Sequence, residues 1–252
     1  MIKKLLIISA IISLIFILIK FVKAEAPLDS DADGLNDYEE QYIYHTDPFQ
    51  ADTDKDGFKD NEEILNKYSP LQKQLKIVEA DTDNDGLNDD WELKIGTDLT
   101  NPDTDNDNYK DGLEVKNGYS PTSKLPQKIE KKIEVICKDF KLNYYFGNKL
   151  LDSIPVSTGK GKTPTPRGEF KILDKIPSKT YGGVNYTFYY PNTKWNMLFT
   201  KDNKGWKYYI HGAYWHNKFG YDNVSGGCVN VKYSDMERLY NFAQIGTKVI
   251  IE

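Results

Sequence analysis

The chain has 252 residues, 39% of them hydrophobic and only two of them cysteine, which excludes a disulfide scaffold, a collagen and a wholly disordered protein. Its formal net charge of -5 conceals a strong division along the chain. Residues 1–26 carry four lysines and one acid, residues 27–123 carry 8 lysines and 26 acids, and residues 124–252 carry 21 basic and 11 acidic residues. A chain divided in this way is expected to have at least two functional parts.

The first 26 residues are typical of an export signal. A short basic start, Met1 to Lys4, precedes an apolar run over residues 5–19. This run lies at the upper limit for a signal peptide and is short for a membrane-spanning helix, which needs about 20 residues. Small residues at Ala24 and Ala26 suit cleavage, so a cleaved signal and a retained anchor in the cytoplasmic membrane both stay open. Either alternative places the rest of the chain in the cell envelope, outside the cytoplasm.

The acidic segment repeats one twelve-residue pattern four times: DSDADGLNDYEE, DTDKDGFKDNEE, DTDNDGLNDDWE and DTDNDNYKDGLE. Each copy has aspartate at positions 1, 3, 5 and 9 and glutamate at position 12, the oxygen-ligand layout of a calcium loop. A solvated acidic linker has no reason to keep this spacing. The candidate metal ligands are Asp29, Asp31, Asp33, Asp37, Glu40, Asp52, Asp54, Asp56, Asp60, Glu63, Asp81, Asp83, Asp85, Asp89, Glu92, Asp103, Asp105, Asp107, Asp111 and Glu114.

The sixth position of each loop requires a sharp turn, and it holds glycine in three copies and Asn108 in the fourth. The apolar residue stands at position 7 and not at position 8, and the helices that follow are predicted to be short, so paired EF-hand lobes are not expected. The pattern resembles bacterial thrombospondin type 3 repeats over about residues 28–122. This resemblance implies a calcium-stiffened stalk, in which calcium has a structural role.

From residue 131 the pattern changes to short alternating strands rich in Val, Ile, Tyr and Phe. One helix is predicted, with Ser234 as its N-cap, Glu237 completing a capping box and Gly246 at its end. The sequence therefore predicts a mainly β domain over residues 124–252, with a sandwich or barrel-like core and one short helix. The predicted strands are 132–140, 142–146, 150–156, 169–176, 187–190, 195–199, 206–210 and 248–251.

The segment IHGAYWHNKFGYDNVSGGCVNV, residues 210–231, contains the candidate catalytic residues. A nucleophilic thiol needs a nearby base and small neighbours that let a carbonyl approach backbone amides. Cys228 follows two glycines, and His211 ends a predicted strand. The sequence thus favours Cys228 as the nucleophile, His211 as the base and the amides of Gly227 and Cys228 as an oxyanion hole.

These residues resemble the active-site signature of the L,D-transpeptidase (YkuD-type) catalytic domain. That signature is a histidine followed, a dozen or more residues later, by Ser/Thr-His-Gly-Cys, an apolar residue and Asn or Arg, and the resemblance extends over about residues 128–252. It implies that Ser225 and Gly212 orient His211 and that Asn230 is the polar residue after the cysteine. Gly226 stands where the family usually has histidine, and His216 and Tyr214 are further candidate substrate contacts.

The resemblance also implies a reaction. Cys228 would attack the carbonyl of meso-diaminopimelate in a peptidoglycan stem tetrapeptide, expel D-alanine and pass the acyl group from a thioester to an amine. No cofactor would take part in the chemistry, so calcium binding and catalysis are expected to be separable. The partners are then peptidoglycan stem peptides, and nucleic acid is not expected because the basic part has no reading helix or stacking motif.

Three alternatives stay open at this point. Cys137 and Cys228 are the only cysteines, and two cysteines in an exported chain suggest a disulfide. Gly226 leaves room for a catalytically degenerate wall-binding or adhesion module. Transfer to water would make the protein an L,D-carboxypeptidase, because the sequence does not select the acyl acceptor.

Overall fold

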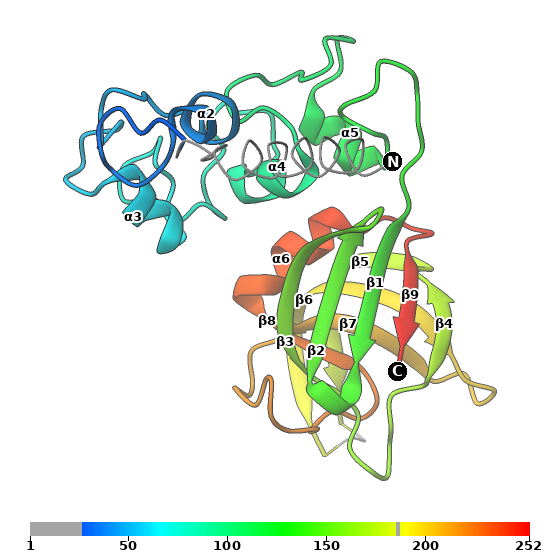
Figure 1. Ribbon diagram of the computed structural model, residues 1–252. Coiled ribbons are helices and arrows are strands. Elements are labelled where there is room, and N and C mark those ends of the chain that lie inside the picture. The colour runs from blue at the N-terminus through cyan, green and yellow to red at the C-terminus, as the bar shows by residue number, and fades with distance from the viewer. Residues whose placement is uncertain (1–26, 185–186) are drawn as a thin grey trace, which may run out of the picture.

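The computed structural model describes residues 27–184 and 187–252, which we divide into a repeat part (residues 27–123) and a sheet part (residues 124–252) (Figure 1). The apolar segment expected to be an export signal, residues 1–26, lies outside the described residues. Within the described ranges, no helix combines the length and the hydropathy needed to cross a membrane.

Each acidic loop leads directly into a short helix that begins at the ninth position of the loop. The last two of these helices end at glycines in the left-handed region, Gly96 with φ 95° and Gly118 with φ 73°. The short helices expected from the sequence are therefore confirmed. They are α2 (Asp37–Glu39), which continues as the π-helix η1 (Glu40–Tyr44), α3 (Asp60–Leu65), α4 (Asp89–Ile95) and α5 (Asp111–Asn117).

The four loops are arranged as two similar pairs. Asp33 Oδ2 accepts a hydrogen bond from the Asn61 amide at 3.0 Å, and Asp85 Oδ2 accepts one from the Gly112 amide at 2.6 Å. A Cβ at Gly112 would lie 2.8 Å from the Asp85 carbonyl oxygen, so only glycine permits this contact. The fifth-position aspartate of loops one and three thus holds the helix that follows the next loop.

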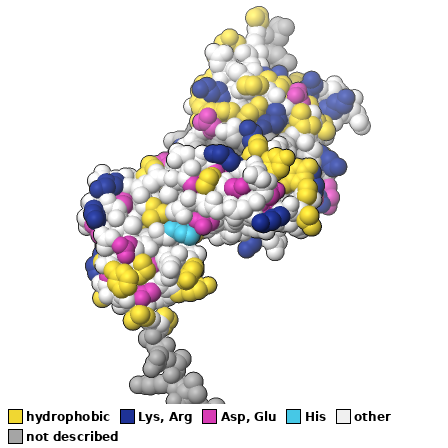
Figure 2. Space-filling model, turned by 90° about the horizontal axis from the view of Figure 1, so that it is seen from above, with side chains coloured by type: hydrophobic (Ala, Val, Ile, Leu, Met, Phe, Trp, Pro, Cys, Tyr) yellow, Lys and Arg dark blue, Asp and Glu magenta, His cyan; other side chains and the backbone are white. Residues whose placement is uncertain are grey.

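The repeat part buries many of its loop carboxylates. Seven of the loop carboxylates at positions 9 and 12 are buried, and several large apolar side chains are exposed, among them Phe49 at 77% and Leu65 at 72%. Figure 2 accordingly shows acidic, basic and hydrophobic side chains interspersed over one face of the molecule. Part of the strong negative charge in the sequence is therefore buried within the loops.

The sheet part is one mixed nine-stranded sheet in the order β4-β9-β1-β2-β3-β8-β7-β6-β5. The pairs β1–β9 and β7–β8 are parallel, and all others are antiparallel. The strands are β1 (Lys131–Ile136), β2 (Lys141–Phe146), β3 (Lys149–Ser157), β4 (Gly168–Lys171), β5 (Asp174–Gly182), β6 (Tyr189–Lys201), β7 (Lys207–Ala213), β8 (Val229–Lys232) and β9 (Lys248–Ile251).

This sheet curls until its two ends meet (Figure 1). Phe170 of β4 contacts Phe199 of β6 edge to face at 5.4 Å, and the Leu173 amide donates to the Leu198 carbonyl at 2.7 Å. Helix α6 (Tyr233–Phe242) packs against the same apolar core through Met236 and Leu239, both fully buried. The predicted mainly β, barrel-like fold with one short helix is confirmed.

Several predicted element boundaries were wrong. The strand expected over 132–140 ends at Ile136, because the 3-10 turn η2 (Cys137–Asp139) and Phe140, with φ 53°, redirect the chain. The strands expected over 187–190 and 195–199 join in β6, which pairs with β5 and β7 on its two sides. Strand β8 was not predicted, because its four residues form a short buried segment that lacks the alternation of an amphipathic strand.

The predicted helix cap was also wrong. Helix α6 begins at Tyr233 after the N-cap Lys232, which makes no side-chain capping bond, and it ends at Phe242, before the predicted Gly246. Ser234 therefore lies inside the helix, where its hydroxyl donates to Asp235 at 3.2 Å. The helix forms here because its apolar face is buried, without the predicted cap.

Candidate functional site

The parallel pairing of β7 with β8 brings the candidate catalytic residues to one face of the sheet. His211 is registered opposite Asn230, and Cys228 immediately precedes β8. Side chains alternate between faces along a strand, so Cys228 and Asn230 share the face of Tyr209 and His211. The intervening residues, including Ile210 and Val229, point into the core and are fully buried.

His211 is held in one orientation on this face. Its Nδ1 lies 2.8 Å from the Gly212 carbonyl, which fixes the hydrogen on Nδ1 and leaves a lone pair on Nε2. The Tyr181 ring stacks on the imidazole at 4.7 Å, and the Tyr181 hydroxyl donates to Asn196 at 2.9 Å. Desolvation lowers the pKa of His211 to about 4, so the imidazole is neutral at pH 7.

Cys228 is partly exposed at the same face. Desolvation raises the pKa of its thiol to about 11, against the opposing effects of a backbone hydrogen bond from Tyr209 and of the Lys179 charge. Within the described residues, no hydrogen bond joins the Cys228 sulfur to an imidazole. At neutral pH Cys228 is therefore a thiol and His211 a neutral imidazole, and the two do not form an ion pair in advance.

Ser225 braces the turn that carries Cys228. Its hydroxyl donates to the Cys228 carbonyl at 2.5 Å and accepts from the Gly227 amide at 3.0 Å, and the Ser225 amide donates to the Thr158 carbonyl at 3.1 Å. The resemblance implied that Ser225 and Gly212 both orient His211; the Gly212 carbonyl contacts the imidazole, whereas the Ser225 hydroxyl contacts Cys228 and Gly227. The Gly227 amide, expected in an oxyanion hole, already has Ser225 as its acceptor.

His216 is paired with Asn230. The Lys218 amide donates to His216 Nδ1 at 3.1 Å, so in the neutral ring the hydrogen is on Nε2. His216 Nε2 lies 2.9 Å from the terminal amide group of Asn230, which must then present its oxygen to this nitrogen. His216 consequently supports Asn230.

The remaining candidates lie at the rim of the site. Gly226 is exposed, and a Cβ built there would meet no atom within 4 Å. Tyr214 is 49% exposed and its hydroxyl donates to the Pro191 carbonyl at 2.9 Å. Sequence motifs do not indicate Asn196 and Lys179, because neither belongs to a recognisable pattern and only the pairing of β5 with β6 brings them near the site.

The cysteines do not form the disulfide that was left open. Both are free thiols, and Cys137 is 4% exposed in the turn η2 after β1. Burial raises the pKa of the Cys137 thiol, as expected for an unreactive core cysteine. The structure therefore does not contain a disulfide between Cys137 and Cys228.

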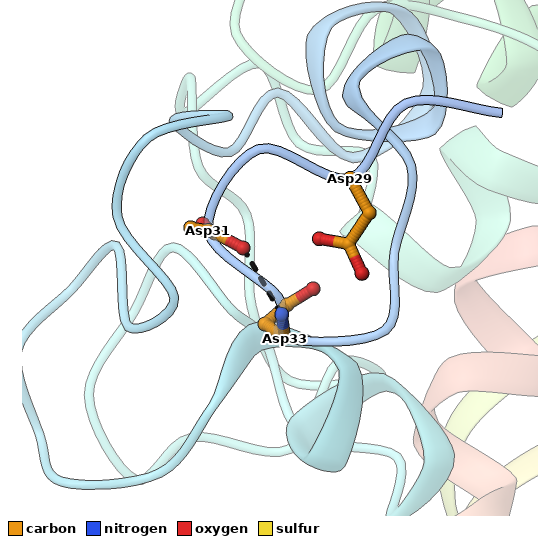
Figure 3. Close-up of side chains that lie close together, drawn as sticks. All are labelled: Asp29, Asp31 and Asp33. Atoms are coloured by element: carbon orange, nitrogen blue, oxygen red, sulfur yellow. Dashed lines mark hydrogen bonds between the residues drawn. The ribbon is translucent and has the colours of Figure 1, made fainter.

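The acidic loops gather their carboxylates in the predicted way at positions 1, 3 and 5. In each loop these three aspartates offer oxygen atoms within 4.8 Å of one another. Figure 3 shows Asp29, Asp31 and Asp33 of the first loop, with the Asp33 amide donating to Asp31 at 3.1 Å. The sixth residue turns with positive φ in every copy, 77° at Asn108, which confirms the predicted left-handed geometry there.

The twelfth-position glutamates complete each cluster. Glu40, Glu63, Glu92 and Glu114 each have a buried Oε2 atom without a hydrogen-bond partner. Desolvation, followed by repulsion from the loop aspartates, raises the pKa of Glu63 to about 8 and that of Glu92 to about 9. Buried carboxylate oxygens without donors are the ligands that a hard cation requires, so the residues fit calcium.

The ninth-position aspartates lie apart from these clusters. In every loop the carboxylate accepts from both the amide and the hydroxyl of the second loop residue, for example from Thr82 to Asp89 at 2.9 and 2.8 Å. Asp37, Asp60, Asp89 and Asp111, which the spacing nominated as ligands, therefore tie the start of each helix to its loop.

Removing calcium is expected to destabilise the repeat part, because the buried loop carboxyl groups would then have to take up protons or repel one another. Each filled site contributes about 2.7 kcal/mol when free calcium is a hundredfold above its dissociation constant. We expect EDTA to lower the thermal unfolding midpoint and the protease resistance of residues 27–123, and excess calcium to restore both. Unchanged circular dichroism and protease resistance in EDTA would contradict this expectation.

Comparison with known proteins is consistent with this geometry. Residues 130–251 match the L,D-transpeptidase catalytic domain, and residues 29–51 and 81–102 match the bacterial TSP3 repeat. A curled mixed sheet that presents a cysteine and a histidine on one face defines a candidate cysteine-nucleophile domain. The chain belongs to the L,D-transpeptidase (YkuD) family. The matched TSP3 segments contain the first and third loops.

Three relatives illustrate the similarity. The chain is 30% identical over 131 residues to the putative L,D-transpeptidase YkuD of Bacillus licheniformis, covering 52% of this chain and 71% of that protein. It is 30% identical over 108 residues to the putative L,D-transpeptidase YqjB of Bacillus subtilis, covering 41% and 61%. A solved L,D-transpeptidase from Mycobacterium smegmatis has a TM-score of 0.45 and 25% identity, covering 50% of this chain and 60% of that one.

Proposed function

We propose that the protein is a peptidoglycan L,D-transpeptidase with Cys228 as nucleophile. The observation that carries this proposal is the face shared by Cys228 and His211, with His211 Nδ1 held by the Gly212 carbonyl at 2.8 Å. This bond leaves Nε2 as the basic atom of the ring. Membership of the family supports the reaction class, and the family's reaction needs no metal or cofactor.

In the first half-reaction, Cys228 Sγ attacks the carbonyl carbon of meso-diaminopimelate at position three of a stem tetrapeptide. His211 Nε2 takes the thiol proton and gives it to the departing nitrogen, so the amide bond breaks, D-alanine leaves and a thioester forms. Because the thiol pKa is about 11 and the imidazole pKa about 4, proton transfer accompanies attack and does not precede it.

In the second half-reaction, an amine attacks the thioester. The carbon–sulfur bond breaks, a new amide bond forms, and the proton lost by the amine returns through His211 to the thiol. The amide of Cys228 is the candidate donor to the oxyanion, joined by the Gly227 amide if that donor leaves Ser225. Asn230, supported by His216, is the candidate contact to the stem peptide.

The repeats are proposed to hold this domain away from the membrane or wall, with calcium in the four loops. The proposed division is an export signal or anchor over residues 1–26, repeats over 27–123 and the catalytic domain over 124–252. The place of action is the cell envelope outside the cytoplasmic membrane, because the proposed substrate lies there.

Two observations favour a second candidate, a wall-binding relative that has lost catalysis. Gly226 lacks the usual imidazole, and no hydrogen bond among the described residues joins the Cys228 sulfur to His211. Transfer of the acyl group to water, a carboxypeptidase outcome, is a further alternative within the enzyme class.

The test is the intact mass of the protein, and of its products, after incubation with a disaccharide tetrapeptide. We expect a thioester adduct on Cys228 or a cross-linked dimer, with release of D-alanine, and complete loss of all three in Cys228→Ala. Cys137→Ala is the matched control and should retain the adduct. A folded protein with a free thiol that never changes mass would favour the wall-binding alternative, and D-alanine release without cross-linking would favour the carboxypeptidase.

A further inference from the structure

The third repeat shares its hydrophobic core with the sheet part. Trp91 of α4 is 7% exposed and contacts Tyr144 of β2 at 5.8 Å and Phe242 of α6 at 5.7 Å, both edge to face. Leu87 and Val115 belong to the same buried cluster. Burying an aromatic side chain of this size is among the larger single contributions to a core. This contact is therefore much more than a flexible junction.

Buried polar contacts reinforce the junction. Lys131, the first residue of β1, is 6% exposed, and its ammonium group donates to the carbonyls of Lys116 and Phe242 at 2.8 Å each. Lys94 of α4 donates to the Leu151 carbonyl of β3 at 2.6 Å. Separating the two parts would break these three hydrogen bonds, which therefore favour the docked arrangement.

The helices that form this junction also carry cation ligands. Trp91 directly precedes Glu92, the twelfth residue of the third loop, and Val115 directly follows Glu114, the twelfth residue of the fourth. Glu92 is fully buried, and its Oε2 atom has no hydrogen-bond partner. A cation bound by Glu92 would fix the start of α4, and hence the position of Trp91, in the core.

Helix α6 connects this junction to the active-site face. Phe242, at its end, contacts Trp91, whereas Tyr233, at its start, packs against the strand that carries His211. A Cβ at Gly212 would lie 2.5 Å from the Tyr233 ring, so the ring occupies the space beside that residue. Helix α6 also follows β8 without a break, and Cys228 immediately precedes β8.

The first repeat offers an internal contrast. No side chain described within residues 27–86 belongs to the core cluster that includes Trp91. Glu40, the twelfth residue of the first loop, is nevertheless as buried as Glu92. Both glutamates accept from a threonine hydroxyl, Thr46 at 3.3 Å and Thr97 at 3.2 Å. Glu40 and Glu92 thus have similar burial and similar threonine contacts. They differ because only the helix that carries Glu92 packs against the core of the sheet part.

We infer that the third calcium loop is a structural part of the catalytic unit, and that Trp91 is the positioning residue through which its occupancy reaches α6 and the active-site face. The inference rests on the proposed calcium binding and on the proposed role of Cys228. It revises the expectation that calcium and catalysis are separable, and it leaves the first two repeats as the stalk.

The test compares Glu92→Gln with Glu40→Gln in the whole chain at 1 mM calcium. Each variant is expected to lose one bound calcium by titration calorimetry. Hydrogen exchange in α6 and β8 should accelerate at least tenfold in Glu92→Gln only, and acylation of Cys228 by a carbapenem should slow at least tenfold in this variant. Trp91→Ala should reproduce both effects with all calcium retained. Trp91→Phe should return both the exchange rate and the acylation rate to near the wild-type values.

Two outcomes would overturn the inference. Loss of one calcium in Glu92→Gln without any change in α6 exchange would show that the loop and the catalytic domain are independent. Retention of every calcium in Glu92→Gln would remove the premise that this residue is a ligand. Neither outcome touches the proposed chemistry, which the mass of the Cys228 adduct in the unmodified protein tests separately.

Discussion

Gly227→Ala is expected to reduce acylation of Cys228 by at least a hundredfold, whereas Gly226→Ala is expected to leave folding unchanged. Gly227 has φ 119°, a backbone conformation that residues other than glycine rarely adopt. A Cβ there would lie 2.7 Å from the Tyr208 ring. The turn would have to shift, and displacement of a reacting group by about 1 Å costs about a hundredfold in rate.

Gly226 differs from its neighbour in both respects. It is exposed, and nothing lies within 4 Å of a Cβ built on it. A substitution of this kind usually changes stability by no more than about 0.5 kcal/mol. Gly226→His should therefore fold normally and would place a histidine two residues before Cys228, as in the active-site signature that the sequence resembles. We expect this variant to be acylated at least tenfold faster, since a second imidazole near Cys228 favours the thiolate.

The measurement is the rate of carbapenem adduct formation, followed by intact mass, beside the thermal unfolding midpoint of each variant. Gly226→Ala is the control that separates the imidazole from the loss of glycine. Rapid acylation of Gly227→Ala would mean that the turn geometry is unimportant. Equal rates for Gly226→His and Gly226→Ala would mean that the missing imidazole does not limit the reaction.

Patterns confined to one segment predicted the structure best. The twelve-residue register predicted that Asp29, Asp31 and Asp33 lie close together, because a loop of this kind closes on itself. The left-handed turn at Asn108 followed from the tolerance of asparagine for that conformation. Most strands were found because one of their faces is buried. In each case the information lies within a few residues of the position that it determines.

Features that depend on distant partners were not predictable in this way. The stack of Tyr181 on His211 requires β5 to lie two strands away from β7, and nothing in either segment states that pairing. Trp91 looked like one more helix residue until its partners in β2 and α6 were known. The aspartates at the ninth position were nominated as ligands because spacing alone does not distinguish a metal ligand from a brace to the second loop residue.

His211 is expected to make the protein lose stability on acidification. Its pKa is about 4 in the folded state and about 6.5 in an unfolded chain, so below pH 6.5 the unfolded state binds the extra proton. The contribution of the neutral His211 side chain to the unfolding free energy is therefore fully present above pH 6.5 and is lost as the pH falls toward 4. The full effect is about 3 kcal/mol, from a difference of roughly 2.5 pKa units at 1.36 kcal/mol each.

The measurement is the unfolding free energy of the wild-type protein and of His211→Gln between pH 7.5 and 4.5, in excess calcium. The variant keeps a polar side chain but does not titrate. Over this range its unfolding free energy should therefore fall by about 2 to 3 kcal/mol less than that of the wild-type protein. Acidic groups in the loops titrate equally in both proteins and cancel in the comparison. Parallel pH dependences would contradict a buried neutral imidazole.

The same neutral imidazole determines how the reaction should depend on pH. A thiol with a pKa of about 11 beside a base with a pKa of about 4 keeps one protonation state across the intervening range. If His211 removes the proton as Cys228 attacks, the acylation rate should be nearly level from about pH 5 to 9. If free thiolate were the nucleophile, the rate would rise tenfold per pH unit instead. The slope of the pH–rate profile therefore distinguishes a general base from a preformed thiolate.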